Sequence, residues 1–133
     1  MQQVIIRGKT YYSLPLFRTI RLVNLMTLYE IGDFDLIQYE SRSIKREISR
    51  SKKMYRTENL MLRFVNRPPQ ILLPLQRTKI WEKISHEIVD IRKDIFESHI
   101  LKIFDFTAWI ESKITKISMQ KIIEKNSYSV VIQ

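Results

Sequence analysis

The segment from Tyr29 to Glu58, YEIGDFDLIQYESRSIKREISRSKKMYRTE, decides the fold. Gly32 can take the left-handed backbone conformation that closes a helix, and Asp33 or Asp35 can cap the helix that follows. After this turn, apolar or small side chains recur at intervals of four and three residues: Ile37, Ser41, Ile44, Ile48, Ser51 and Tyr55. That spacing predicts one stripe on a helix. Because the two serines on it are small, a neighbouring helix could approach closely there.

Helical periodicity continues on both sides of this hairpin. Pro15 stands where the first turn of a helix tolerates proline, and good helix formers follow it up to Ile31. A third apolar set ends at Pro68 and Pro69, which forbid a continuing helix. Beyond it, two more segments carry isoleucines at helical spacing: Ile80, Ile84, Ile88 and Ile91, then Ile100, Ile103, Ile110, Ile114 and Ile117. We therefore expect an all-α domain of about five helices, stacked as antiparallel hairpins, near residues 13–31, 34–51, 53–66, 75–93 and 96–118.

The length and composition are those of one folded domain, and we expect a short segment outside this domain at each end. The chain has 133 residues, of which 44% are apolar and 28% charged, and it contains only two glycines and four prolines. Residues 1–12 are expected to form an extended leader and residues 119–133 a tail of undetermined state. The apolar run from Leu14 is interrupted by Arg18 and Arg21, so no membrane span is expected, and the lack of a signal-peptide pattern favours the cytoplasm.

Tyr29, Gly32 and Phe34, placed ahead of an amphipathic helix, resemble the hairpin of a tetratricopeptide repeat. A second copy would lie roughly 34 residues further on, where Asn66, the next most tolerant residue of the left-handed conformation, falls under Gly32. The sequence departs from the family pattern at Ile37, where the family favours small residues, and at two prolines that occupy the second aromatic position.

The run from residue 13 to about 117 is also similar to the C-terminal region of bacterial proteins that carry degenerate tetratricopeptide-like helices. These resemblances imply a short right-handed array of helical hairpins that binds other proteins, either as a whole chain or as the end of a longer array. They imply structural roles for Tyr29, Gly32 and Phe34, and no catalytic or cofactor-binding residues.

The residues that could carry chemistry do not assemble into a catalytic pattern. His86 begins a near match to the zinc-protease helix, but Asp90 occupies the position of the second histidine, and His99 stands alone. Ser49 and Lys52 match Ser-x-x-Lys without its companion motifs. The chain has no cysteine, and neither glycine belongs to a phosphate-binding loop. We therefore predict a chain that is not an enzyme and holds no metal or cofactor.

Positive charge is concentrated between Arg42 and Arg56. Seven lysines and arginines lie in this interval against one acid, Glu47, so it supplies six of the net nine positive charges. Five of them form the candidate basic ridge: Arg42, Arg46, Arg50, Lys53 and Arg56. It is either the solvated face of an outer helix or a surface for nucleic acid phosphates. We expect a non-catalytic protein-binding or scaffold module, and a nucleic-acid-binding helical domain is the alternative.

The first helix is apolar on more than one side. Leu16, Ile20 and Val23 lie on the side away from Leu14, Leu25 and Leu28. A helix of this kind is covered on both sides. We expect this candidate apolar interface to be covered by preceding repeats of a longer protein, by a second copy or by a protein partner.

Overall fold

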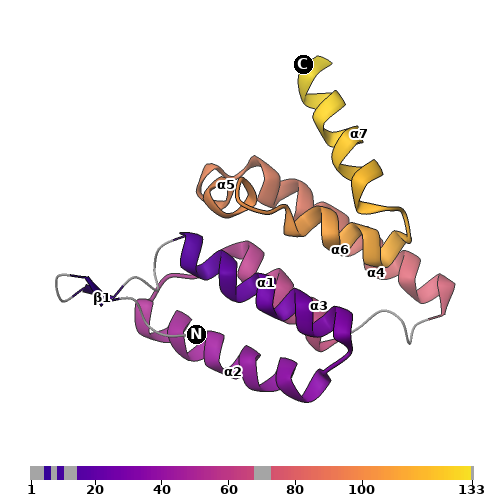
Figure 1. The fold of residues 1–133 in the computed structure, drawn as a ribbon. Helices are drawn as coiled ribbons and strands as arrows, with labels where there is room; N and C mark the ends of the chain where they lie inside the picture. The colour runs from indigo at the N-terminus through magenta and orange to yellow at the C-terminus, as the bar shows by residue number, and fades with distance from the viewer. Residues whose placement is uncertain (1–4, 7–8, 11–14, 68–72, 133) are drawn as a thin grey trace.

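A computed structural model describes the backbone of residues 5–6, 9–10, 15–67 and 73–132, and the side chains of residues 15–67 and 73–126. The described residues form seven helices (Figure 1): α1 Pro15–Ile31, α2 Phe34–Ser51, α3 Arg56–Asn66, α4 Pro74–Lys93, α5 Ile95–Leu101, α6 Phe106–Thr115 and α7 Met119–Ile132. Two-residue strands, β1 (Ile5–Ile6) and β2 (Lys9–Thr10), pair antiparallel ahead of α1. The all-α prediction is confirmed for the domain itself.

The helices form two groups joined through the centre of the molecule. In Figure 1, α1, α2 and α3 lie together, α4, α5 and α6 form a second group, and α7 projects from the end of α6. The short helix α3 packs against α1, α2, α5 and α6, while α4 packs against α5 and α6. Seven of the eleven residues of α3 are buried, so α3 is the centre of the core.

The predicted number of helices, about five, is wrong because the segment near 96–118 is broken and the chain beyond it is helical. The backbone N–H of Phe96 donates to Asp94 Oδ1 at 2.9 Å, and that of Ala108 donates to Asp105 Oδ1 at 3.1 Å. Each aspartate thus caps a new helix, α5 and then α6. The break turns both Ile100 and Phe106 toward the core, where neither is exposed.

The turn between α1 and α2 is closed as its residues suggest. Gly32 has φ +85°, and its N–H donates to Leu28 O at 2.9 Å. Asp33 Oδ1 accepts from the N–H of Leu36 at 3.1 Å and caps α2. Among the described residues, Lys52 and Lys116 also have positive φ, and each follows the end of a helix.

The predicted equivalence of Asn66 and Gly32 does not hold. Asn66 is the last residue of α3, and its φ is not positive. Its side chain instead donates to Leu62 O at 2.7 Å and to Ser41 Oγ at 3.1 Å, which ties the end of α3 to α2. Residues 68–72, with Pro68, Pro69 and the remainder of the proposed second copy, lie outside the described residues.

Within the part of the chain that the structure describes, no helix has the length and apolarity required to cross a bilayer.

Candidate functional site

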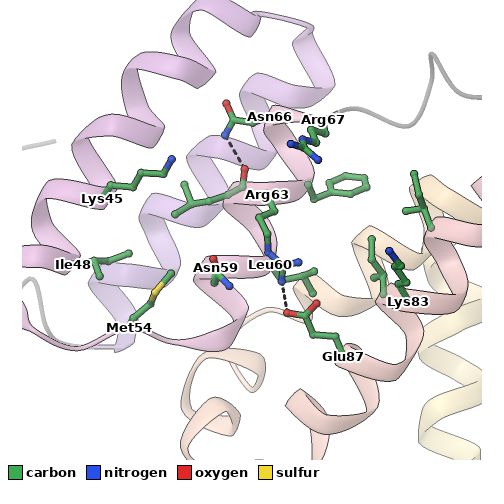
Figure 2. A pocket seen from close by; sticks show the side chains of 14 residues that line it. Lys45, Ile48, Met54, Asn59, Leu60, Arg63, Asn66, Arg67, Lys83 and Glu87 are labelled. Atoms are coloured by element: carbon green, nitrogen blue, oxygen red, sulfur yellow. Dashed lines mark hydrogen bonds and ion pairs between the residues drawn. The ribbon is translucent and has the colours of Figure 1, made fainter.

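A pocket of about 810 Å³ lies between α3 and its neighbours α2 and α4, and we call it the groove (Figure 2). Fourteen residues line it: Lys45, Ile48, Met54, Asn59, Leu60, Leu62, Arg63, Phe64, Asn66, Arg67, Ile80, Lys83, Ile84 and Glu87. A volume of this size lies in the usual range of ligand-binding pockets, roughly 300–1,000 Å³. It is therefore the first candidate for a binding site.

The interior of the groove is apolar. Leu60, Leu62 and Phe64 of α3 form its floor and are also members of the hydrophobic core. Ile48 of α2, together with Ile80 and Ile84 of α4, stands on the walls and is only half-buried. The groove therefore offers partly exposed aliphatic side chains that a partner could cover.

The rim of the groove is basic. It carries Lys45 from α2, Arg63 and Arg67 from α3 and its end, and Lys83 from α4, against a single acid, Glu87. Arg63 and Glu87 form an ion pair that joins α3 to α4. Lys45, Arg67 and Lys83 have no ion pair with any described residue. Figure 2 shows Lys45 and Lys83 on opposite walls, so uncompensated positive charge flanks the apolar interior.

The basic ridge is exposed, but its five members are not equivalent. Arg42, Arg46 and Arg50 lie on α2 and have no ion pair with a described carboxylate. The ammonium of Lys53 lies 4.6 Å from the centre of the Phe96 ring, and Arg56 Nε is 3.8 Å from Asp94 Oδ2. Lys53 and Arg56 therefore contact other elements of the fold, whereas Arg46 and Arg50 are exposed on α2 and Arg42 donates to Gln38 O of its own helix at 3.4 Å.

Of the three residues in the candidate apolar interface on α1, only two are largely exposed. Leu16 is 59% exposed and Ile20 is 41% exposed. Val23 is half-buried and packs against the core. The exposed apolar surface on this helix therefore centres on Leu16 and Ile20.

Tyr29 connects the first hairpin to the core. Its ring centre lies 5.4 Å from that of Phe64 on α3 and 5.2 Å from that of Trp109 on α6. Burial, aided by the nearby Glu30 carboxylate, raises the pKa of Tyr29 to about 12. Phe34, by contrast, is 43% exposed at the start of α2.

The two histidines lie outside any cluster that could bind a metal. His86 and His99 are both exposed, and the described residues contain no group of three or more His, Cys, Asp or Glu side chains placed to hold an ion. The groove, the basic ridge and the apolar surface of α1 are thus the features left to consider.

Sequence reasoning did not find the groove, although it found several of its residues. Ile80 and Ile84 belong to the predicted stripe of α4, but the core buries only the later part of that stripe, Ile88 and Ile91. Ile48 was likewise assigned to the stripe of α2. Periodicity shows that these residues share a face with core residues, and it cannot show where the neighbouring helix ends.

In comparisons with known proteins, no family model, no curated protein and no solved structure matches this chain.

Proposed function

We propose that this chain is a non-catalytic helical interaction module that binds a segment of another protein in the groove between α2, α3 and α4. The observation that carries the proposal is the set of half-buried isoleucines, Ile48, Ile80 and Ile84, facing a common apolar interior. Apolar anchors that fill such pockets supply most of the binding energy of protein interfaces. A polar rim around an apolar centre is also the usual organisation of these interfaces.

A tetratricopeptide-like arrangement of the first three helices is part of this proposal. It is supported by the Gly32 turn between α1 and α2 and by the packing of α3 against both of these helices. The more complex packing of α4, α5 and α6 gives no comparable support for a continuing array.

The test is a search for peptides that bind the groove. The chain has no cysteine, so Met54→Cys at the edge of the groove can carry a single environment-sensitive dye. Peptides selected by display against the purified chain should shift the signal of this dye. Ile84→Ser should weaken the binding of these peptides by roughly tenfold, because one aliphatic contact is lost.

Ile103→Ser is the matched control, since Ile103 is 46% exposed and does not line the groove. It should leave the affinity unchanged. Peptide binding that is equally sensitive to both substitutions, or to neither, would refute the groove as the binding site.

The exposed arginines of α2 favour nucleic acid binding as the second candidate. If Arg42, Arg46 and Arg50 bind phosphates, the affinity for duplex should fall with salt, with a log–log slope near −0.9 per neutralised phosphate. Arg46→Glu combined with Arg50→Glu should then abolish binding without unfolding the chain. A titration with single- and double-stranded nucleic acid at two salt concentrations distinguishes the candidates, and tight binding near physiological salt would favour nucleic acid.

A further inference from the structure

The rim of the groove indicates which kind of segment it binds. Building on the proposed function, we propose that the partner is an acidic amphipathic helix. Its apolar side would lie on Ile48, Ile80 and Ile84, and its carboxylates would face Lys45 and Lys83.

The charge of the rim favours an acidic partner. The rim carries four cations against one carboxylate, and that carboxylate, Glu87, is already paired with Arg63. An apolar or basic segment in the groove would remove water from Lys45, Arg67 and Lys83 without replacing it by a counter-charge, which is unfavourable. Carboxylates at the edges of the segment would remove that penalty and would orient the segment between α2 and α4.

The walls of the groove explain why the segment should be helical. All three elements that form it, α2, α3 and α4, are helices, whose backbone groups bond within each helix. The described walls of the groove therefore offer no sheet edge with which the backbone of an extended segment could pair. A helix satisfies its own backbone and can place apolar side chains at intervals of about three and four residues.

The interior argues against nucleic acid in the same place. Phe64 is the only aromatic residue among the lining residues, and it is 5% exposed. Grooves that bind single-stranded nucleic acid combine a basic path for the backbone with accessible aromatic faces on which bases stack. The described lining residues of this groove offer no accessible aromatic face, so bases would have nothing to stack on.

The experiment compares two synthetic helices of about 18 residues, long enough for several helical turns. Both carry leucine at positions i, i+3, i+4 and i+7; one has glutamate on the polar face and the other has lysine. Titrated against the dye-labelled Met54→Cys chain, the acidic helix should bind at least tenfold more tightly, and the difference should shrink as salt rises.

Charge reversal on the rim provides the decisive comparison. Lys45→Glu with Lys83→Glu should invert the preference toward the basic helix. Arg46→Glu with Arg50→Glu makes the same charge change on the outer face of α2, outside the groove, and should leave the preference intact. If the charge-reversed chain unfolds, Lys45→Gln with Lys83→Gln replaces it in the experiment. This neutral variant should bind the acidic helix more weakly without preferring the basic helix.

Failure of this inference differs from failure of the proposed function. Equal affinity for both helices, combined with loss of binding in Ile84→Ser, would overturn the acidic partner and leave the groove as a binding site. Dye signals insensitive to Ile84→Ser would overturn both. If the chain binds nucleic acid and loses this binding in Lys45→Glu with Lys83→Glu, the proposal that a helical segment occupies the groove would be overturned.

Discussion

At the scale of single residues, a buried ion pair joins Arg18 of α1 to Glu58 in the first turn of α3. Arg18 and Glu58 are 5% and 2% exposed, and two hydrogen bonds of 2.7 and 2.6 Å join them. Glu58 also accepts from the N–H of Tyr55 at 2.8 Å, and Glu97 accepts from the N–H of Thr57 at 2.7 Å. Burial raises the pKa of the Glu58 carboxyl, while Arg18 opposes that shift. These two carboxylates thus accept from the backbone N–H groups of Tyr55, which precedes α3, and of Thr57 in its first turn.

Removing the cation of this pair should be strongly destabilising. Arg18→Met leaves Glu58 buried without its counter-charge, so we expect the free energy of unfolding to fall by about 3–5 kcal/mol. Urea denaturation measures this loss. The double variant Arg18→Met with Glu58→Gln should lose less than the sum of the two single losses. Strict additivity would contradict a coupled pair.

Glu30 should make the stability dependent on pH. Burial acts to raise the pKa of its carboxyl, but the hydrogen bonds from Lys113 and Trp109 outweigh it, so the pKa lies below its ordinary value. A carboxyl whose pKa is lower in the folded state stabilises the fold above its unfolded pKa, and this contribution is lost as the pH falls through the folded pKa. Glu30→Gln should therefore destabilise the chain at neutral pH and matter progressively less under acidic conditions. Denaturation of both chains across this pH range checks the sign, and a constant difference would contradict it.

At the scale of elements, the contact between α2 and α3 depends on a small residue. Ser41 is 3% exposed, and the Asn66 side chain donates to its hydroxyl at 3.1 Å. This burial agrees with the close approach that the small residue was expected to permit. The same amide also donates to Leu62 O, so Asn66 keeps a partner when the hydroxyl is removed.

Enlarging Ser41 should therefore be worse than shortening it. Ser41→Leu overpacks the contact and should lower the free energy of unfolding by about 1–3 kcal/mol, whereas Ser41→Ala should be nearly neutral. Thermal or urea denaturation of both variants measures the difference. Equal effects would mean that α2 and α3 are not closely packed at this position.

At the scale of the whole molecule, the exposed part of α1 favours association. Leu16 and Ile20 present apolar side chains beyond the packed core. We expect light scattering to report a dimer or larger species, and Leu16→Ser with Ile20→Ser to shift it toward monomer. Val89→Ser is the control, because Val89 is 47% exposed on α4, a helix that packs against α5 and α6. A monomer at every concentration would contradict self-association and leave a different partner as the way to cover this surface.

Local sequence was sufficient for much of the helical content. Glycine at residue 32, with an aspartate after it, specifies the first turn through the left-handed backbone and a side-chain cap, and both act within a few residues. The stripe that contains Ile37 and Ile44 likewise follows from helical period alone, and both residues are buried. The positive φ of Lys52 and Lys116 was not predicted, because lysine has no intrinsic preference for this backbone conformation.

The groove is decided only by tertiary structure. Ile84 and Ile88 belong to one stripe on α4, yet Ile88 is buried in the core while Ile84 is half-buried in the wall of the groove. The difference arises because α5 and α6 cover one part of α4, and the helical period within α4 does not specify these contacts. The positions of Lys45 and Lys83 on facing walls have the same origin, since their helices are brought together through α3. Period and composition thus determine which residues are apolar or charged on each helix, while packing between helices determines which apolar face remains uncovered and which charges surround it.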